Sequence, residues 1–323
     1  MRWPGRRARR AACLLLIACL SLGTAPGARS AVGDRLDRSG LRPAWGEEFD
    51  APVDWCAEFC GRERWRTKFF HSGDTPLSRG LGQNTESQIF MDPTYLRLGI
   101  HPFPVRDGVL SLLVEPADRR VRDAVAAAWP SWYSGPRPVP RFTAGMLSTE
   151  RSYRQRYGYF EARIRVPRMR GAWPAFWLLG QAGTHDEIDV MEVLAAETDR
   201  HYGGHQWTRP DGSKDSARFD LRTADLSQGF HTYGVLWTAE RLVYYRDDRV
   251  IAEFRNPGLH APMYLLISMG TDGDWNRQLG FRAPDEGRAR MEIDFVRAYC
   301  IGPAEGCPAG GATPPAPIAP SVR

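Results

Sequence analysis

The sequence of 323 residues contains almost no lysine, few cysteines and no hydrophobic run long enough to cross a membrane. Lysine occurs only at Lys68 and Lys214, and arginine carries most of the positive charge. The longest apolar stretch, residues 11–22, is shorter than the roughly 20 residues that a transmembrane helix needs. We therefore expect no membrane span. Helical periodicity is weak throughout, and no internal repeat is found, which argues against helical bundles and repeat proteins.

The N-terminus has the pattern of a secretory signal peptide. Five arginines among residues 2–10 precede the short apolar stretch, and small residues follow it. We place the signal peptide at residues 1–30, with cleavage after Ser30, and expect a secreted or periplasmic protein. Residues 16–19 also resemble a lipobox, which would instead anchor a lipoprotein through Cys19. The apolar run before Cys19 is short for that signal.

The positive charge of the chain belongs largely to this leader. The formal net charge is +5, but the first 30 residues contain six arginines and no acidic residue, so removing them leaves −1. The mature protein therefore lacks the basic character that nucleic-acid binding requires, and we expect no nucleic-acid partner.

Four cysteines remain after the leader: Cys56, Cys60, Cys300 and Cys307. In an exported protein they predict two disulfides, for which three pairings are possible. We favour the local pairs Cys56–Cys60 and Cys300–Cys307. Zinc is the alternative, although the spacings suit it poorly.

The remaining sequence is typical of a single all-β domain, which we place at residues 31–302. Short strand-like runs at 159–166, 173–178 and 291–297, and a hairpin with an acidic turn at 242–252, are separated by Gly, Pro and Asp. Such spacing predicts a sandwich or barrel of antiparallel strands. Residues 303–323 are rich in Pro, Ala and Gly and are predicted to be a disordered tail. We expect a monomer.

The most informative segment is the hexamer E-I-D-V-M-E at residues 187–192. Side chains alternate between the two faces of a strand, so Glu187 and Asp189 share one face. A regular strand would turn Glu192 to the other face, but a β-bulge near Met191 would bring it back. Three convergent carboxyls raise one another's pKa, and carboxyls with separated pKa values serve glycoside hydrolysis. A merely solvated acidic face is the alternative explanation.

Tryptophan is abundant, with 11 residues. Its flat ring suits either core packing or stacking on sugar rings. Trp237 fits both explanations equally, whereas Trp173 lies close to the carboxylate strand. Trp129 and Trp132 lie on a Pro-rich loop between two predicted strands, where exposed aromatics would suit a binding lip.

Several motifs, taken in order, resemble glycoside hydrolase family 16, and the resemblance extends from about residue 45 to 299. The most specific is the E-x-D-x-x-E hexamer. The others are W-G-E-E-F-D (45–50), N-T-E-S-Q (84–88), Y-G-Y-F-E-A-R (157–163), W-P-A-F-W-L (173–178), F-H-T-Y (230–233) and D-F-V-R (294–297). The resemblance implies a β-sandwich jelly roll of two antiparallel sheets with a concave substrate cleft.

By the same resemblance, Glu187 is the nucleophile, Glu192 the general acid/base and Asp189 an assisting carboxylate. It further implies substrate-binding roles for a second group: Asn84, Glu161, Arg163, Trp173, His205 and Trp207. No cofactor is expected for catalysis. The family often carries a structural Ca²⁺, for which Asp294 is the candidate ligand here.

The expected function is therefore that of a secreted, retaining endo-β-glycanase acting on β-1,3 or mixed-linkage β-1,3-1,4 glucan. His185 and Asp186 stand where many bulged members carry Trp or Gly, which leaves the polysaccharide open. Alternatives are a transglycosylase and a hydrolase of a bacterial exopolysaccharide or algal galactan. A non-catalytic lectin on the same sandwich would not need all three carboxylates.

Overall fold

The computed structural model describes residues 34–57, 65–82, 84–180 and 186–301. The predicted signal peptide and tail lie outside these ranges, as do Cys60 and Cys307, so the leader, the tail and the disulfide pairings stay predictions. The two other cysteines, Cys56 and Cys300, are buried. No helix among the described residues is long and apolar enough to cross a membrane.

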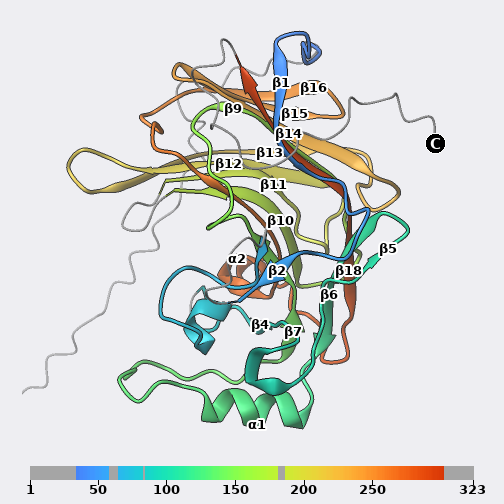
Figure 1. Ribbon diagram of the computed structural model, residues 1–323, viewed down its shortest axis with the longest axis vertical. Helices are drawn as coiled ribbons and strands as arrows, with labels where there is room; N and C mark the ends of the chain where they lie inside the picture. The colour runs from blue at the N-terminus through green and yellow to red at the C-terminus, as the bar shows by residue number, and fades with distance from the viewer. Residues whose placement is uncertain (1–33, 58–64, 83, 181–185, 302–323) are drawn as a thin grey trace, which may run out of the picture.

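The larger sheet has ten strands in the described part of the chain (Figure 1). Its order is β16 (Arg249–Arg255), β15 (Arg241–Arg246), β14 (His231–Trp237), β9 (Gly158–Arg165), β18 (Ala289–Ile301), β6 (Val109–Pro116), β7 (Phe142–Ala144) and β4 (Gln88–Phe90). Two further strands pair beside this path: β1 (Leu41–Glu47) with β18, and β5 (Val105–Arg106) with β6.

The smaller sheet has eight described strands and carries the acidic hexamer on β11. Its order is β13 (Lys214–Arg222), β12 (Arg200–Thr208), β11 (Glu187–Glu192), β10 (Ala172–Leu179), β17 (Tyr264–Thr271), β8 (Met146–Ser148), β3 (Trp65–Arg66) and β2 (Trp55–Cys56). The prediction of an all-β sandwich is confirmed. Each sheet also contains one parallel pair, β4 with β7 and β2 with β3, so the sheets are not purely antiparallel.

Helices are short and lie in the connections between described strands. The α-helices are α1 (Arg119–Ala127) and α2 (Gly273–Gln278), and two 3₁₀ turns are η1 (Pro76–Arg79) and η2 (Tyr95–Arg97). The α1 helix begins where the side chain of Asp118 accepts a hydrogen bond from the backbone N–H of Val121. It lies at the end of the molecule opposite β1 and β16 (Figure 1).

The core lies between the two sheets and follows from the alternation of side chains along strands such as β10. On β10, exposure alternates residue by residue, so that Phe176 and Leu178 are fully buried. They belong to the same apolar cluster as Phe160 of β9 and Trp237 of β14. Trp237 is therefore a core residue, and its indole N–H donates to the backbone carbonyl of Leu259 at 3.1 Å.

We expect Phe176→Ala to lower the free energy of unfolding by about 3–5 kcal/mol, because it leaves a cavity beneath the strand that neighbours β11. Urea unfolding followed by tryptophan fluorescence measures the change. Phe70, which is 38% exposed, supplies the matched control. Equal losses for Phe176→Ala and Phe70→Ala would show that the sheet-to-sheet core does not dominate stability.

Candidate active site

The three carboxyls of the hexamer reach the same face of β11 through a β-bulge, as predicted. Against β10, Met191 lies opposite Phe176 while Asp189 lies opposite Trp177, so the pairing skips one residue. Against β12, the pairing is also interrupted between Asp189 and Glu192. Val190 and Met191 both face the core as a result. Glu187, Asp189 and Glu192 therefore share the face of the smaller sheet that is turned away from the core, here called the open face.

Glu187 is held by two side chains on this face. Gln206 of β12, directly opposite in register, donates from Nε2 to Glu187 Oε1 at 2.7 Å. Asp189 shares a side-chain hydrogen bond with Glu187. Both contacts favour an ionised Glu187, although burial raises its pKa above the ordinary range.

Asp189 is the most strongly perturbed member of the cluster. Burial raises its pKa well above the ordinary value, and the charges of Glu187 and Glu192 raise it further. Both effects favour a protonated Asp189, which then donates the hydrogen bond to Glu187. A neutral Asp189 beside an ionised Glu187 removes the repulsion that three adjacent charges would create.

Glu192 lies at the other end of the hexamer and is suited to a proton donor. Burial, followed by the charge of Glu187, raises its pKa to about 7. Trp173 of β10 opposes this shift, because its indole N–H donates to Glu192 Oε1 at 3.0 Å. Glu192 is thus protonated in mildly acidic solution and releases its proton near neutrality.

We expect Trp173→Phe to raise the pKa of Glu192 by roughly half to one pH unit, because the variant removes a donor to the charged form. The alkaline limb of the pH–rate profile measures it. Trp177→Phe is the matched control, since Trp177 donates to Ser268 Oγ at 3.2 Å instead of to a carboxyl. An alkaline limb that moves equally in both variants would contradict the assignment.

An aromatic group adjoins the Glu192 end of this face. Trp275 of α2 packs edge-to-face against Trp173, with ring centroids 5.7 Å apart, and against Tyr202 of β12 at 4.6 Å. Tyr202 lies opposite Glu192 in register. No motif in the sequence predicts a role for Trp275, Tyr202 or Gln206. No local signal separates Gln206 from His205, because the preceding Gly203 and Gly204 carry no side chain.

Asn84 lies beside the same group. The backbone carbonyl of Asn84 accepts a hydrogen bond from the N–H of Asp274 in α2 at 2.9 Å. Its neighbour Glu86 accepts from the side chains of Asn84 and Gln88. A Cβ added at Gly273 would lie 3.1 Å from the Trp173 ring and 3.6 Å from Glu86 Cγ, which places Glu86 next to Trp173. Burial raises the pKa of Glu86 to about 7.

The sequence profile of glycosyl hydrolases family 16 matches residues 132–297, which include every strand from β7 to β17. The chain belongs to glycosyl hydrolases family 16. It is 34% identical over 243 residues to the endo-1,3-1,4-beta-glycanase ExsH of Rhizobium meliloti (strain 1021), covering 73% of this chain and 48% of the relative. It is 37% identical over 228 residues to EglC of the same strain, another endo-1,3-1,4-beta-glycanase, covering 68% and 44%.

The chain thus spans about half the length of these curated relatives. Solved structures support the fold. SCLam, described as a non-specific endo-beta-1,3(4)-glucanase of the family, superposes with a TM-score of 0.64 at 24% identity, covering 86% of this chain and 97% of SCLam. The catalytic domain of a laminarinase from Thermotoga petrophila RKU-1 gives 0.60 at 20% identity, covering 81% and 98%. The predicted family and jelly-roll fold are confirmed.

Two residues predicted to bind substrate in this family 16 chain face the core instead. His205 lies opposite Ile188, so its side chain shares the inner face of the smaller sheet. It contacts Tyr244 and Phe254 of the other sheet, and burial lowers its pKa to about 4. Trp207 stacks on His205 and packs against the core. The predicted strand is correct, but Gln206 rather than His205 points to the carboxyls.

Glu161 and Arg163 do not join the site either. Both lie on β9, which belongs to the larger sheet, and point to that sheet's outer face. Glu161 is fully buried and accepts from Arg38 Nη2 at 2.7 Å and from the hydroxyl of Tyr299 at 3.0 Å. Arg163 pairs with Asp294 at 2.6 Å. Their alternation was predicted correctly, but it serves structural ion pairs on the opposite sheet.

Asp294, the predicted calcium ligand, forms this ion pair with Arg163. The guanidinium of Arg163 donates a hydrogen bond to one carboxylate oxygen of Asp294, and its positive charge would repel a calcium ion there. Across the described ranges, no group of three or more His, Cys, Asp and Glu side chains could hold a metal ion. Backbone carbonyls supply much of a calcium site, so a structural calcium at Asp294 stays a prediction.

The predicted binding lip is divided between core and surface. Trp129 is only 7% exposed and belongs to a small apolar cluster with Val121 and Val125 of α1, so its prediction as an exposed contact is wrong. Trp132, on the same loop, is 65% exposed. Its neighbour Tyr133 stacks on Trp129, with ring centroids 5.1 Å apart.

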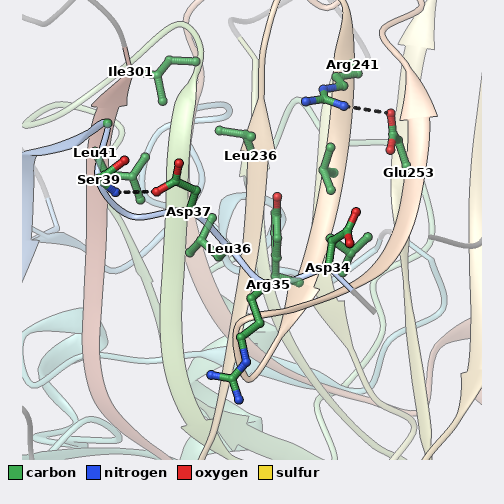
Figure 2. Close-up of a pocket in the computed structure, with 14 residues that line it drawn as sticks. Asp34, Arg35, Leu36, Asp37, Ser39, Leu41, Leu236, Arg241, Glu253 and Ile301 are labelled. Atoms are coloured by element: carbon green, nitrogen blue, oxygen red, sulfur yellow. Dashed lines mark hydrogen bonds and ion pairs between the residues drawn. The ribbon is translucent and has the colours of Figure 1, made fainter. Parts of the chain in front are cut away.

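A separate hollow of about 430 Å³ lies on the outer face of the larger sheet (Figure 2). Residues 34–37 and 39–41 line it, together with Leu236, Val243 and Tyr245 of β14 and β15. None of the hexamer carboxyls lines it. The hollow is therefore distinct from the carboxylate site. Figure 2 shows Arg241 and Glu253 paired at its rim.

Proposed function

We propose that this protein is an exported, retaining endo-β-glycanase that cleaves β-1,3 or mixed-linkage β-1,3-1,4 glucan. The observation that supports it best is the bulged strand, which places a hydrogen-bonded Glu187 and a Glu192 of raised pKa on one open face. A retaining mechanism needs one ionised carboxyl as nucleophile and one protonated carboxyl as acid.

In the first step, Glu187 attacks the anomeric carbon while Glu192 gives its proton to the departing glycosidic oxygen. The C–O bond to the leaving sugar breaks, and an ester between the sugar and Glu187 forms. The N–H of Gln206 fixes the rotamer of Glu187 for this attack. Asp189, by donating to Glu187, stabilises its charge before the attack and keeps its own proton when that charge disappears.

In the second step, Glu192 acts as a base. It takes a proton from water as the water oxygen attacks the anomeric carbon, and the ester bond to Glu187 breaks. The sugar leaves with its original configuration, and both carboxyls return to their starting states. If a sugar hydroxyl replaces water, the same cycle yields transglycosylation.

The proposed substrate class rests on similarity to characterised glycanases. The two curated relatives are endo-1,3-1,4-beta-glycanases, and SCLam is described as acting on 1,3(4)-glucan. The aromatic group of Trp173, Tyr202 and Trp275 offers apolar ring surface beside Glu192, as stacking on pyranose rings requires. Export is proposed from the basic and apolar leader alone.

The test is reducing-sugar release by the purified full chain on laminarin, lichenan, xyloglucan, agarose and carrageenan, with Glu187→Gln as control. Release from laminarin or lichenan that the control abolishes supports the proposal. Activity on another polymer alone would replace the substrate class. Binding without release, unchanged in the control, would favour a lectin, and transfer to added oligosaccharides would favour a transglycosylase.

A further inference from the structure

Arg218 of β13 lies on the open face in line with the centre of the carboxylate cluster. Asp189 of β11 pairs with Gly204 of β12, which pairs in turn with Arg218. Directly opposed residues share a face, so these three form one row across the sheet. The flanking rows are Glu187–Gln206–Ser216 and Glu192–Tyr202–Asp220.

The long side chain of Arg218 can extend toward the carboxyls because Gly204, the middle residue of this row, has no side chain. Adjacent strands lie roughly 4.8 Å apart, so the backbones of Asp189 and Arg218 are separated by about twice that distance. Gly204 has φ of +153°, and a Cβ there would lie 2.2 Å from the Ala217 carbonyl and 2.8 Å from Arg218 Cα. Any other residue would fill the space between Arg218 and the carboxyls.

Arg218 also differs from the other arginines near this edge of the sheet. Arg222 pairs with Asp199 at 2.8 Å, and the partners Arg200 and Asp220 neutralise each other. Arg218 is exposed, and within the described ranges its guanidinium forms no ion pair or hydrogen bond. Its charge nevertheless acts on all three carboxyls, lowering the pKa of Glu187, Asp189 and Glu192.

We propose that Arg218 is a positioning residue that compensates the negative charge of the catalytic cluster across the gap at Gly204. This inference rests on the proposed function, which supplies the roles of the carboxyls. Arg218 favours the ionised form of Glu187 and limits how firmly Glu192 holds its proton, against the larger effect of burial. It therefore sets the pH range in which one carboxyl is charged and the other is not.

Apart from Glu86 beside Trp173, whose pKa burial raises to about 7, the other groups that face the cluster are uncharged in this range. Gln206 and Trp173 are neutral donors. Burial raises the pKa of Tyr264 of β17 above its ordinary value and that of Tyr202 of β12 to about 12. Tyr244 of β15 approaches Asp189 from the core side, with its pKa raised well above the ordinary value by burial. Arg218 is thus the cation to which the cluster responds.

The test compares Arg218→Gln, Arg218→Lys and Arg222→Gln in the full chain. Losing the charge of Arg218 should raise the acidic and alkaline pKa values of the kcat/KM profile by about half a pH unit each. Arg218→Gln should then be about threefold slower than wild type on the acidic limb and about threefold faster on the alkaline limb. Arg218→Lys should restore most of the profile, and Arg222→Gln should leave it in place.

A measurement without substrate separates this inference from the proposed function. Carbon-13 NMR titration of the side-chain carboxyls, assigned by comparison with Glu187→Gln, should show the same upward movement in Arg218→Gln. Unchanged titrations would overturn the inference, even in an active enzyme. An equal movement in Arg222→Gln, or a rise in KM with titrations unchanged, would overturn it too. Moved titrations without activity on any polymer would support it while refuting the proposed function.

Discussion

Glu187→Gln is expected to lower kcat on the natural polymer by about 10⁴-fold or more, the scale on which loss of a catalytic nucleophile acts. Glutamine keeps the shape of the side chain but cannot form the ester with the sugar. After rotation, its amide can still form hydrogen bonds with Gln206 and Asp189, so folding should be preserved. Reducing-sugar assays at enzyme concentrations high enough to quantify the residual rate measure the loss.

Two controls make this result specific. Glu253→Gln changes a half-buried glutamate on β16 of the other sheet, paired with Arg241, and should retain wild-type kcat. Unfolding midpoints of both variants should stay near that of the wild type, which shows that lost activity is not lost fold. If Glu187→Gln keeps more than a hundredth of the activity, Glu187 is not the nucleophile.

The carboxylate face could be predicted because its signal is local. Two apolar residues in succession, Val190 and Met191, break the alternation of the hexamer, and only a bulge lets both reach the core. The same local logic predicted the alternating faces of β9 and β10. Such inferences depend on residues close in sequence, where strand geometry alone decides the outcome.

Errors arose where the decision depended on which sheet a strand joins. Alternation shows that Glu161 and Phe160 point to opposite sides of β9, but not which side meets solvent, substrate or another segment. The structure covers Glu161 with Arg38, 123 residues away in sequence. A long-range ion pair of this kind leaves no local trace, so the glutamate resembled a surface residue of the substrate face.

On β12 the prediction assigned side chains to the wrong faces of the strand. His205 and Gln206 are both polar, and the preceding Gly203 and Gly204 provide no side chain from which to assign the buried face. A shift of one residue exchanges the two faces, so the histidine was predicted where the glutamine lies. On α1, the cap at Asp118 and the four-residue spacing of Val121 and Val125 could have indicated the helix that buries Trp129.

Glu192→Ala should separate two classes of substrate. On the natural glucan, the leaving sugar needs a proton, so its loss should lower kcat/KM by roughly 10²–10⁴-fold. On an aryl β-glycoside with an acidic phenol, the leaving group departs as an anion without help, and kcat/KM should fall less than about tenfold. Parallel assays of both substrates with wild type and variant measure the difference.

The pH dependence of kcat/KM also tests Glu192 as the acid. Burial raises the pKa of Glu192 to about 7, so wild-type kcat/KM on the polymer should fall as pH rises through that value and the acid loses its proton. The residual rate of Glu192→Ala on the aryl glycoside should show no such fall, because the titrating group is gone. Trp173→Phe, which keeps Glu192 but removes its donor, should retain the fall at a higher pH. An alkaline limb that survives in Glu192→Ala would assign the acid to another carboxyl, and Asp189, which holds its proton most firmly, would be the next to test.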